Sequence, residues 1–450
     1  MRLDVETALL PGGWASNVRI TVVDGLVADV EIGVDGSGGR RRRVAIPGLV
    51  NLHSHAFQRS LAGLVETRGT GVDSFWTWRE AMYRFLDAMT ADDIEAITAF
   101  AFMEMLEAGF TRVGEFHYVH HGRDGRPFAA IGETSQRVAA AAAETRIALT
   151  LLPVFYAHST FGGVAPDHGQ RRFISDLDAF ARIVEGAEHA VSALVDANVG
   201  LAPHSLRAVT PEELAAVVEM AGDRPIHIHV AEQVKEVEDC IAWSGQRPVA
   251  WLLDNAPVDR RWCLIHATHM TGDETEALAR TGAVAGFCPL TEASLGDGIA
   301  NVVEWVGYGG AFGVGTDSNI LIGAAEELRQ LEYGQRLRRR ERNILSGPDH
   351  GSTGRFLFDA ACRGGAEALG SAVPDIAVGQ PADLVILDCD HPTLTGRNGD
   401  RILDAWIFAG RGVISDVYRR GRAVVADGRH VGRPAIEGRY RQTLERLLRM

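Results

Sequence analysis

The most informative part of the chain reads Val44-Ala-Ile-Pro-Gly-Leu-Val-Asn-Leu-His-Ser-His55, an apolar run that ends in two histidines. A nearly continuous apolar run is typical of a strand buried on both faces of a parallel sheet. Residues two apart in a strand point to the same side, so His53 and His55 can face one metal ion. A lone His-x-His is a weak signal, because two solvent-facing loop histidines give the same pattern. The interpretation therefore depends on the rest of the chain.

Seven further apolar, β-rich runs follow, with helical stretches between them. They are Arg112–His117, Ala148–Tyr156, Val199–His204, Ile226–Glu232, Trp262–His266, Ala283–Cys288 and Phe312–Asp317. Eight strand–helix units over roughly 300 residues predict a (β/α)₈ TIM barrel. An open doubly wound sheet is the alternative, but no Gly-x-Gly-x-x-Gly fingerprint follows an early strand.

Both ends of the chain have a different, hairpin-like pattern. An Asp-Gly dipeptide separates two β-rich runs between Val18 and Ile32, and strand-like runs return at Ala382–Leu387 and Val413–Tyr418. We expect both ends to join in one small β-sandwich domain. The expected division is residues 1–46 and 373–450 for this domain, with a helix at the C-terminus, and residues 47–372 for the barrel.

The composition is that of an acidic protein with a large core. The chain has 450 residues, 46% of them hydrophobic, and a formal net charge of −14. This charge argues against nucleic acid as a partner, because binding phosphates needs a basic face.

No apolar run reaches the ~18 residues of a membrane span, and the first residues do not resemble a secretory signal. Five scattered cysteines favour a reduced, cytoplasmic protein.

Polar side chains gather at the expected carboxyl ends of the strands, where barrel enzymes carry their catalytic groups. A second His-x-His, His227 and His229, ends one strand, and Asp317 ends the last. Three imidazoles and a carboxylate suit one divalent ion, with Zn²⁺ expected and Fe²⁺ as the alternative. The expected metal ligands are His53, His55, His229 and Asp317.

Two further residues are placed to move protons beside such an ion. A metal ion lowers the pKa of a bound water to ~7, which provides hydroxide at neutral pH. Glu232 lies just past a strand end, where it can reach that water; its alternative role is a first-turn acid of the next helix. His266 can orient the reacting group, or it can be a satisfied core histidine. The expected catalytic residues are Glu232, His266 and Asp317.

At these positions the sequence resembles the amidohydrolase superfamily. The resemblance is carried by Pro47–His55, His229-Val-Ala-Glu232, His266, Gly315-Thr-Asp317 and the segment Val378–Asp388. Superfamily members with two metals usually bridge them with a carboxylated lysine after the fourth strand. The only lysine here is Lys235, which lies elsewhere, so the resemblance implies the branch of deaminases with one metal.

Within that branch, longer stretches are similar to deiminases that act on a linear amidine. They are Asn51–Arg59, Ser74–Arg79, Glu115–His121, His204–Val209 and Leu331–Arg336. The resemblance implies hydrolysis of N-formimidoyl-L-glutamate to N-formyl-L-glutamate and ammonia in histidine degradation, by attack of metal-bound hydroxide on the formimidoyl carbon. Asn319 departs from some members, which have histidine there.

The implied substrate is a dicarboxylate, and arginine binds carboxylates bidentately while staying charged. We expect Arg79 and Arg207 to bind the two carboxylates. The residues expected to add hydrogen bonds are Gln58, Tyr118 and His204. For Arg79 the alternative is a surface arginine stacked on tryptophan, and for Gln58 and Tyr118 it is ordinary packing.

Other functions remain open at this point. Another deaminase of the same branch, acting on guanine or a related heterocycle, would need aromatic and amide groups rather than two arginines. An amide hydrolase on this scaffold would release no ammonia from a formimidoyl substrate, and a non-catalytic metal-binding barrel would need neither Glu232 nor His266.

A homodimer is expected from base rates, with the arginine-rich segment Glu327–Arg342 as a candidate interface.

Overall fold

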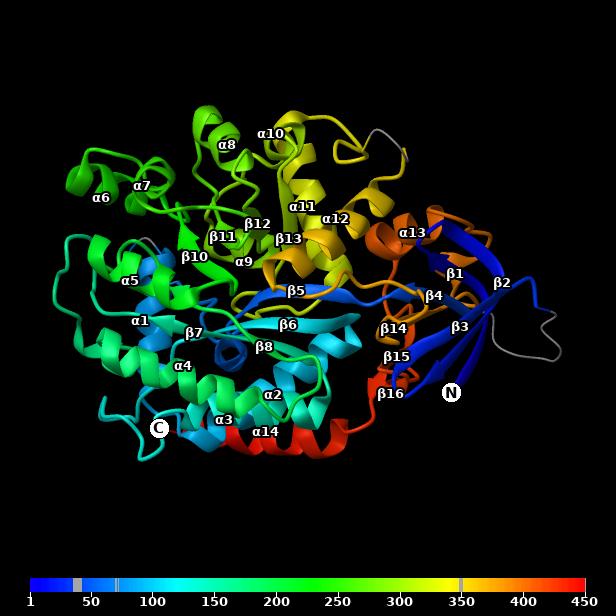
Figure 1. The fold of residues 1–450 in the computed structure, drawn as a ribbon, viewed down its shortest axis with the longest axis horizontal. Helices are drawn as coiled ribbons and strands as arrows, with labels where there is room; N and C mark the ends of the chain where they lie inside the picture. The colour runs from blue at the N-terminus through cyan, green and yellow to red at the C-terminus, as the bar shows by residue number, and fades with distance from the viewer. Residues whose placement is uncertain (35–42, 69–70, 72, 348–350, 450) are drawn as a thin grey trace.

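The computed structural model describes residues 1–34, 43–68, 71, 73–347 and 351–449. Two sheets organise these residues (Figure 1). One is a parallel barrel sheet in the middle of the chain, and the other is a mixed sheet built from both chain ends. No helix in the described ranges is long and apolar enough to cross a membrane.

The barrel sheet contains nine parallel strands. They are β5 (Leu49–Ser54), β6 (Phe110–His117), β7 (Ala148–Phe155), β8 (Asn198–Val199), β9 (Ala202–Pro203), β10 (Ile226–Val230), β11 (Trp262–His266), β12 (Val284–Phe287) and β13 (Ala311–Val314). The hydrogen-bonded order is β10-β11-β12-β13-β5-β6-β7-β8, and β9 also pairs with β7, so β8 and β9 share one position. Parallel bridges from Leu201 to Ile226 and from Ser205 to His229 connect that position to β10. The expected (β/α)₈ fold class is confirmed.

Helices surround the barrel. They are α1 (Phe75–Leu86), α2 (Ala91–Glu107), α3 (Glu133–Thr145), α4 (Leu177–Val191), α5 (Pro211–Ala221), α6 (Val234–Ser244), α7 (Pro248–Asn255), α8 (Gly272–Ala279), α9 (Pro289–Leu295), α10 (Val302–Gly307), α11 (Ala324–Arg339), α12 (Thr353–Ala368), α13 (Arg401–Ala409) and α14 (Arg433–Leu447). Helix α2 begins with a capping box, in which Asp93 accepts the Thr90 N–H at 2.7 Å. The C-terminal helix α14 lies along α2, where Tyr440 stacks on Phe100 with ring centroids 3.9 Å apart (Figure 1).

The second sheet joins the two ends of the chain, at the right of Figure 1. Its strands are β1 (Arg2–Leu10), β2 (Gly13–Val23), β3 (Leu26–Ile32), β4 (Arg43–Pro47), β14 (Leu384–Asp388), β15 (Ile414–Arg419), β16 (Arg422–Ala426) and β17 (Arg429–His430). Their order is β17-β16-β15-β14-β4-β1-β2-β3, with the N-terminal β4 antiparallel to the C-terminal β14. The domain boundaries at 46/47 and 372/373 remain a prediction.

Only Gly48 separates this second sheet from the first barrel strand. A Cβ at Gly48 would lie 2.2 Å from the side chain of Thr111, so only glycine permits this approach of β4–β5 to β6. The strand that carries His53 and leads to His55 is therefore joined directly to the second sheet.

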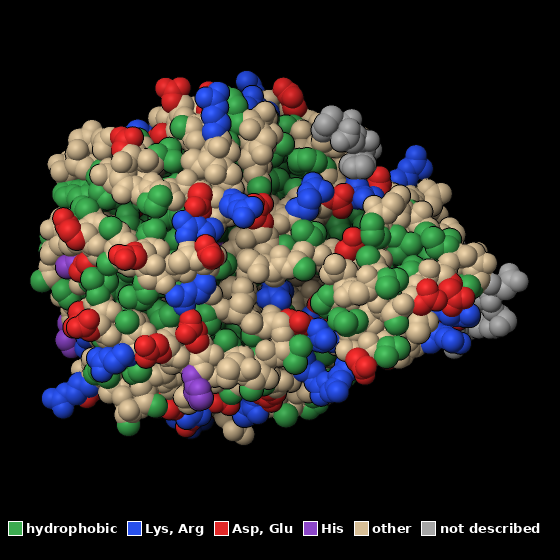
Figure 2. All heavy atoms as spheres, in the orientation of Figure 1, with side chains coloured by type: hydrophobic (Ala, Val, Ile, Leu, Met, Phe, Trp, Pro, Cys, Tyr) green, Lys and Arg blue, Asp and Glu red, His purple; other side chains and the backbone are tan. Residues whose placement is uncertain are grey.

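Basic and acidic side chains are interspersed over the face drawn in Figure 2.

Candidate active site

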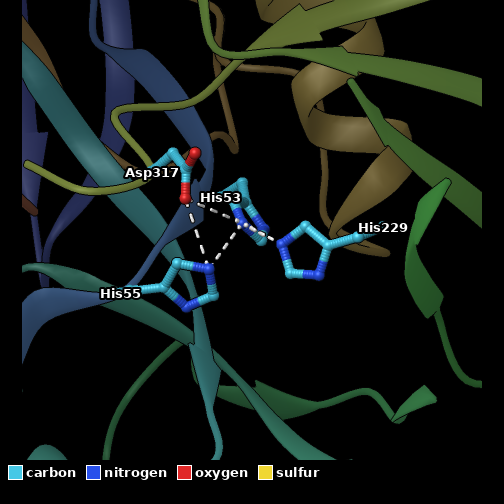
Figure 3. A group of neighbouring side chains, drawn as sticks. All are labelled: His53, His55, His229 and Asp317. Carbon is cyan, nitrogen blue, oxygen red and sulfur yellow. Dashed lines mark hydrogen bonds and ion pairs between the residues drawn. The ribbon is translucent and has the colours of Figure 1, made fainter. Parts of the chain in front are cut away.

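Three histidines and one aspartate converge at the carboxyl ends of β5, β10 and β13 (Figure 3). The Nε2 atom of His53 lies 3.2 Å from Nε2 of His55 and 3.1 Å from Nε2 of His229. Oδ1 of Asp317 lies 3.3 Å from Nε2 of His55 and 3.5 Å from Nε2 of His53. All four side chains are buried. The structure thus brings together all four residues expected to ligate a metal.

The hydrogen bonds of these histidines fit a bound cation. Nδ1 of His55 lies 3.0 Å from the backbone oxygen of Phe116, and Nδ1 of His229 lies 3.0 Å from that of His204. Because carbonyl oxygens only accept, both Nδ1 atoms donate, and the neutral rings present lone pairs at Nε2. Burial lowers the pKa of His53, His55 and His229, which keeps them neutral. Lone pairs that face one another beside a carboxylate repel, so this donor set suits a divalent metal ion.

Glu232 and His266 lie beside this cluster. Nε2 of His266 is 3.8 Å from Oε1 of Glu232 and 3.7 Å from Oδ2 of Asp317. Burial raises the pKa of Glu232 to about 7. Burial disfavours charge on His266, but the neighbouring carboxylates of Glu232, Glu292 and Asp317 outweigh it and raise its pKa well above the usual value. Glu232 can therefore take up and release a proton near neutral pH, while His266 keeps its proton.

The backbone at these strand ends is held in an uncommon conformation. His266 and Asp317 have φ angles of 68° and 43°, and Ala231, before Glu232, has 53°. Non-glycine residues rarely adopt the left-handed region, and they cluster at functional sites when they do. The turns aim three polar side chains inward from three different strands.

A cavity lies directly over this group. His55, His229, Glu232, His266 and Asp317 contribute to its lining. Its walls are aromatic and basic: Phe75, Trp78, Arg79, Tyr83, Tyr118, Tyr156, Phe173 and Arg207. A concave site with aromatic walls and a few polar groups in defined places is typical of small-molecule binding.

The two arginines expected to bind carboxylates meet around one tryptophan. The Cζ atoms of Arg79 and Arg207 lie 4.8 Å and 5.7 Å from the ring centroid of Trp76. Arg207 is only 4% exposed, yet its Nε has no hydrogen-bond partner among the described residues, and the same holds for Nε of Arg79. Burial disfavours charge on Arg207, but nearby acidic groups, Glu236 first, raise its pKa, so it remains a cation. The cavity is thus lined by two guanidinium groups, buried Arg207 and half-buried Arg79, each with an Nε that has no partner among the described residues.

The remaining expected substrate residues also line the cavity. Nε2 of Gln58 donates to the Tyr118 hydroxyl at 2.8 Å, while Oε1 of Gln58 has no partner in the described part of the chain. Nδ1 of His204 lies 3.1 Å from the hydroxyl of Ser205. Asn319, by contrast, is fully buried and donates to Ser54 and to the backbone of Asp317. Asn319 therefore braces the turn that carries Asp317.

Two further side chains beside the site, both just after β12, were not predicted from the sequence. Oε1 of Glu292 lies 3.2 Å from Nδ1 of His266. Cys288 has its sulfur within 4.8 Å of ligand atoms of His266 and Asp317. The only available signal was their position after the seventh apolar run, where barrel enzymes carry functional groups.

Comparisons with known proteins cover the whole chain. Residues 44–424 match the model of the amidohydrolase family, and residues 5–44 match that of the formimidoylglutamate deiminase HutF, N-terminal domain. A curated formimidoylglutamate deiminase of Pseudomonas aeruginosa is 49% identical over 98% of each chain. A 5-methylthioadenosine/S-adenosylhomocysteine deaminase of Natronomonas pharaonis is 28% identical over 95% of this chain and 94% of its own.

Solved structures show the same fold. An amidohydrolase from Brucella melitensis superposes with a TM-score of 0.95 at 53% identity, covering 99% of both chains. An adenosine deaminase from Xanthomonas campestris, solved with bound zinc, has a TM-score of 0.84 at 21% identity, covering 100% of this chain and 98% of its own. The second likeness extends to the fold alone.

Proposed function

Because this chain belongs to the amidohydrolase family of metal-dependent hydrolases, we propose that it converts N-formimidoyl-L-glutamate and water to N-formyl-L-glutamate and ammonia, a step of histidine degradation. One observation carries the proposal. A single cavity is lined by three of the expected metal ligands, by Glu232 and His266, and by Arg79 and Arg207. The relative of Pseudomonas aeruginosa, named for this reaction, supports it.

We propose Zn²⁺ as the single divalent ion, with Fe²⁺ as the alternative. The ligands would be His53, His55, His229 and Asp317, whose donor atoms already face one another. Such an ion supplies a Lewis acid that makes water acidic enough to react at neutral pH.

The reaction also needs protons to move between water and the leaving nitrogen. In the ionised form Glu232 accepts a proton from the attacking water, and in the protonated form it donates to the terminal nitrogen. The C–N bond to that nitrogen then breaks, and ammonia leaves. Asp317, which lies beside the imidazole of His266, also accepts a proton from the attacking water. His266, which is charged and lies between carboxylates, stabilises the negative charge that develops on the oxygen that water adds to the formimidoyl carbon.

Substrate binding falls to the polar residues on the cavity wall. Arg79 and Arg207 bind the two carboxylates of the glutamyl part, because the Nε of each has no hydrogen-bond partner among the described residues. Gln58, Tyr118 and His204 add hydrogen bonds that hold the formimidoyl group over Glu232. A heterocyclic base such as guanine has no carboxylate for these two guanidinium groups to bind.

The test is a substrate comparison with the purified protein. Ammonia release is measured with N-formimidoyl-L-glutamate and, in parallel, with guanine, and the organic product is identified by mass spectrometry. Release from the first compound only, with N-formyl-L-glutamate as product, is the expected result. Release from guanine alone, or formation of glutamate and formamide, would overturn the proposal.

We also propose that the protein is a cytoplasmic homodimer. All five cysteines are free, as in a reducing compartment. Helix α11 exposes Leu337 at 77% and Tyr333 at 38%, which suits an interface between two copies. Light scattering of the wild type and of Leu337→Glu, with the dimer lost in the variant, would test this assignment.

A further inference from the structure

A second group of metal-ligating side chains lies against the first. One ring nitrogen of His266, the sulfur of Cys288 and one carboxylate oxygen of Asp317 all lie within 4.8 Å of one another. All three residues are buried, and they come from the ends of β11, β12 and β13. The group shares Asp317 with the histidine cluster described above.

The carboxylate of Asp317 is oriented so that each oxygen faces a different group. Oδ1 faces the histidine cluster, at 3.3 Å from Nε2 of His55, while Oδ2 faces Nε2 of His266 at 3.7 Å. A carboxylate placed in this way can bridge two ions, and the metals of two-metal sites lie ~3.5–4 Å apart. Oε1 of Glu232, 3.8 Å from the same nitrogen, offers a further oxygen.

The position of the thiol depends on a glycine in the next strand segment. A Cβ at Gly315 would lie 3.1 Å from Sγ of Cys288 and 2.8 Å from Cβ of His53. Glycine therefore leaves the space that lets the thiol pack directly behind the histidine cluster. Sulfur, imidazole and carboxylate together form a donor set for a thiophilic divalent ion such as Zn²⁺ or Cd²⁺.

We propose that a second, thiophilic divalent ion binds between His266, Cys288 and Asp317 and inhibits the enzyme. The thiol of Cys288 and the imidazolium of His266 each lose a proton to solvent as they bind the ion. The ion takes up the imidazole and the second aspartate oxygen, which the reaction uses to handle protons. Binding of the ion is independent of the proposed function; only the predicted inhibition rests on it.

The test begins with protein that holds one Zn²⁺ per chain and adds Cd²⁺. Total metal per chain, thiolate-to-Cd²⁺ charge-transfer absorption in the ultraviolet, and ammonia release are followed together. We expect a second ion per chain, an absorption band that grows with it, and loss of activity over the same range of concentration. The histidine cluster contains no sulfur, so exchange of the first ion for Cd²⁺ adds no thiolate band.

The chain provides a matched pair of cysteine variants. Cys263 is as buried as Cys288 and also packs 3.1 Å from the Cβ position of a glycine, Gly286, but it belongs to neither ligand group. We expect Cys288→Ser to lose the band and to need at least about tenfold more Cd²⁺ for inhibition, a difference of ~1.4 kcal/mol. Cys263→Ser should behave as the wild type.

Each outcome decides the proposal. Binding that stops at one ion per chain in the wild type overturns it, whether or not the variants fold. An unchanged band in Cys288→Ser, or a band lost in both variants, also overturns it. A second ion with its band in a protein that releases no ammonia supports the site and contradicts the proposed function. Ammonia release without a second ion does the reverse.

Discussion

Glu292 holds the imidazole of His266 from a neighbouring segment of the barrel: its Oε1 lies 3.2 Å from Nδ1 of the ring. The same oxygen accepts the backbone N–H of Cys288 at 2.8 Å, which fixes the carboxylate in place. A carboxylate on Nδ1 sets the tautomer and orientation of a histidine. The other nitrogen, Nε2, is thereby directed at Glu232 and Asp317.

Replacing Glu292 by glutamine should lower kcat while KM stays nearly constant. An amide supports the ring but not its positive charge, and loss of such a partner typically costs ~10- to 100-fold. The pH–rate profile should also shift, because the imidazolium loses a counter-charge. Glu327→Gln is the control, since Glu327 is equally buried and accepts the N–H of Leu290 without contacting His266. Equal effects of both variants would reduce Glu292 to a packing role.

Glu232→Gln should keep the metal and lose turnover. The amide has the shape of the carboxylate but cannot carry a proton between water and nitrogen, and loss of such catalysis costs ~10²–10⁴-fold in rate. Metal content by elemental analysis and kcat for ammonia release are the two measurements. A variant that loses its metal instead would make Glu232 a ligand.

Arg207→Met should weaken substrate binding and spare the metal. A hydrogen bond to a charged group contributes ~1.5–3 kcal/mol, so KM should rise by roughly 10- to 100-fold. Arg182→Met, on the exposed side of α4, is the matched control and should leave KM unchanged. If both variants have the wild-type KM, Arg207 does not bind the substrate.

His117 should make the fold acid-sensitive. Its ring is buried against Thr134, with Nε2 2.9 Å from the hydroxyl, and burial lowers its pKa to about 3. As pH falls below ~6.5 the unfolded chain gains a proton that the folded chain does not, so stability is lost at up to ~1.4 kcal/mol per pH unit. Urea unfolding between pH 7 and pH 4 should show a smaller slope for His117→Gln than for wild type. The exposed His189→Gln should keep the wild-type slope; identical slopes in all three proteins would refute the assignment.

Much of the site could be predicted because it follows the period of the strands. Alternation places His53 and His55 on one side of their strand, and the barrel topology brings the end of the last strand, with Asp317, to the same centre. Both arginines were found through the chemistry of the implied substrate rather than through a pattern. Their meeting around Trp76 depends on how α1 packs over the barrel, which no local signal encodes.

Other features depend on contacts that the sequence does not display. Glu292 reaches His266 across 26 residues, and its spacing after β12 is also that of an ordinary first-turn helix acid. The fourth barrel strand was expected as one run, but it forms two short pieces around Gly200, where a Cβ would lie 2.8 Å from the oxygen of Pro225. Only the packed structure reveals that approach.

The central claim is that one metal ion in the histidine–aspartate cluster supports deimination. The most direct measurement is ammonia release from N-formimidoyl-L-glutamate while Zn²⁺ is returned stepwise to chelated protein. The account predicts a rate that rises in proportion to metal content and reaches its maximum at one ion per chain. Full activity without metal, or a rate that continues to rise to two ions per chain, would contradict it.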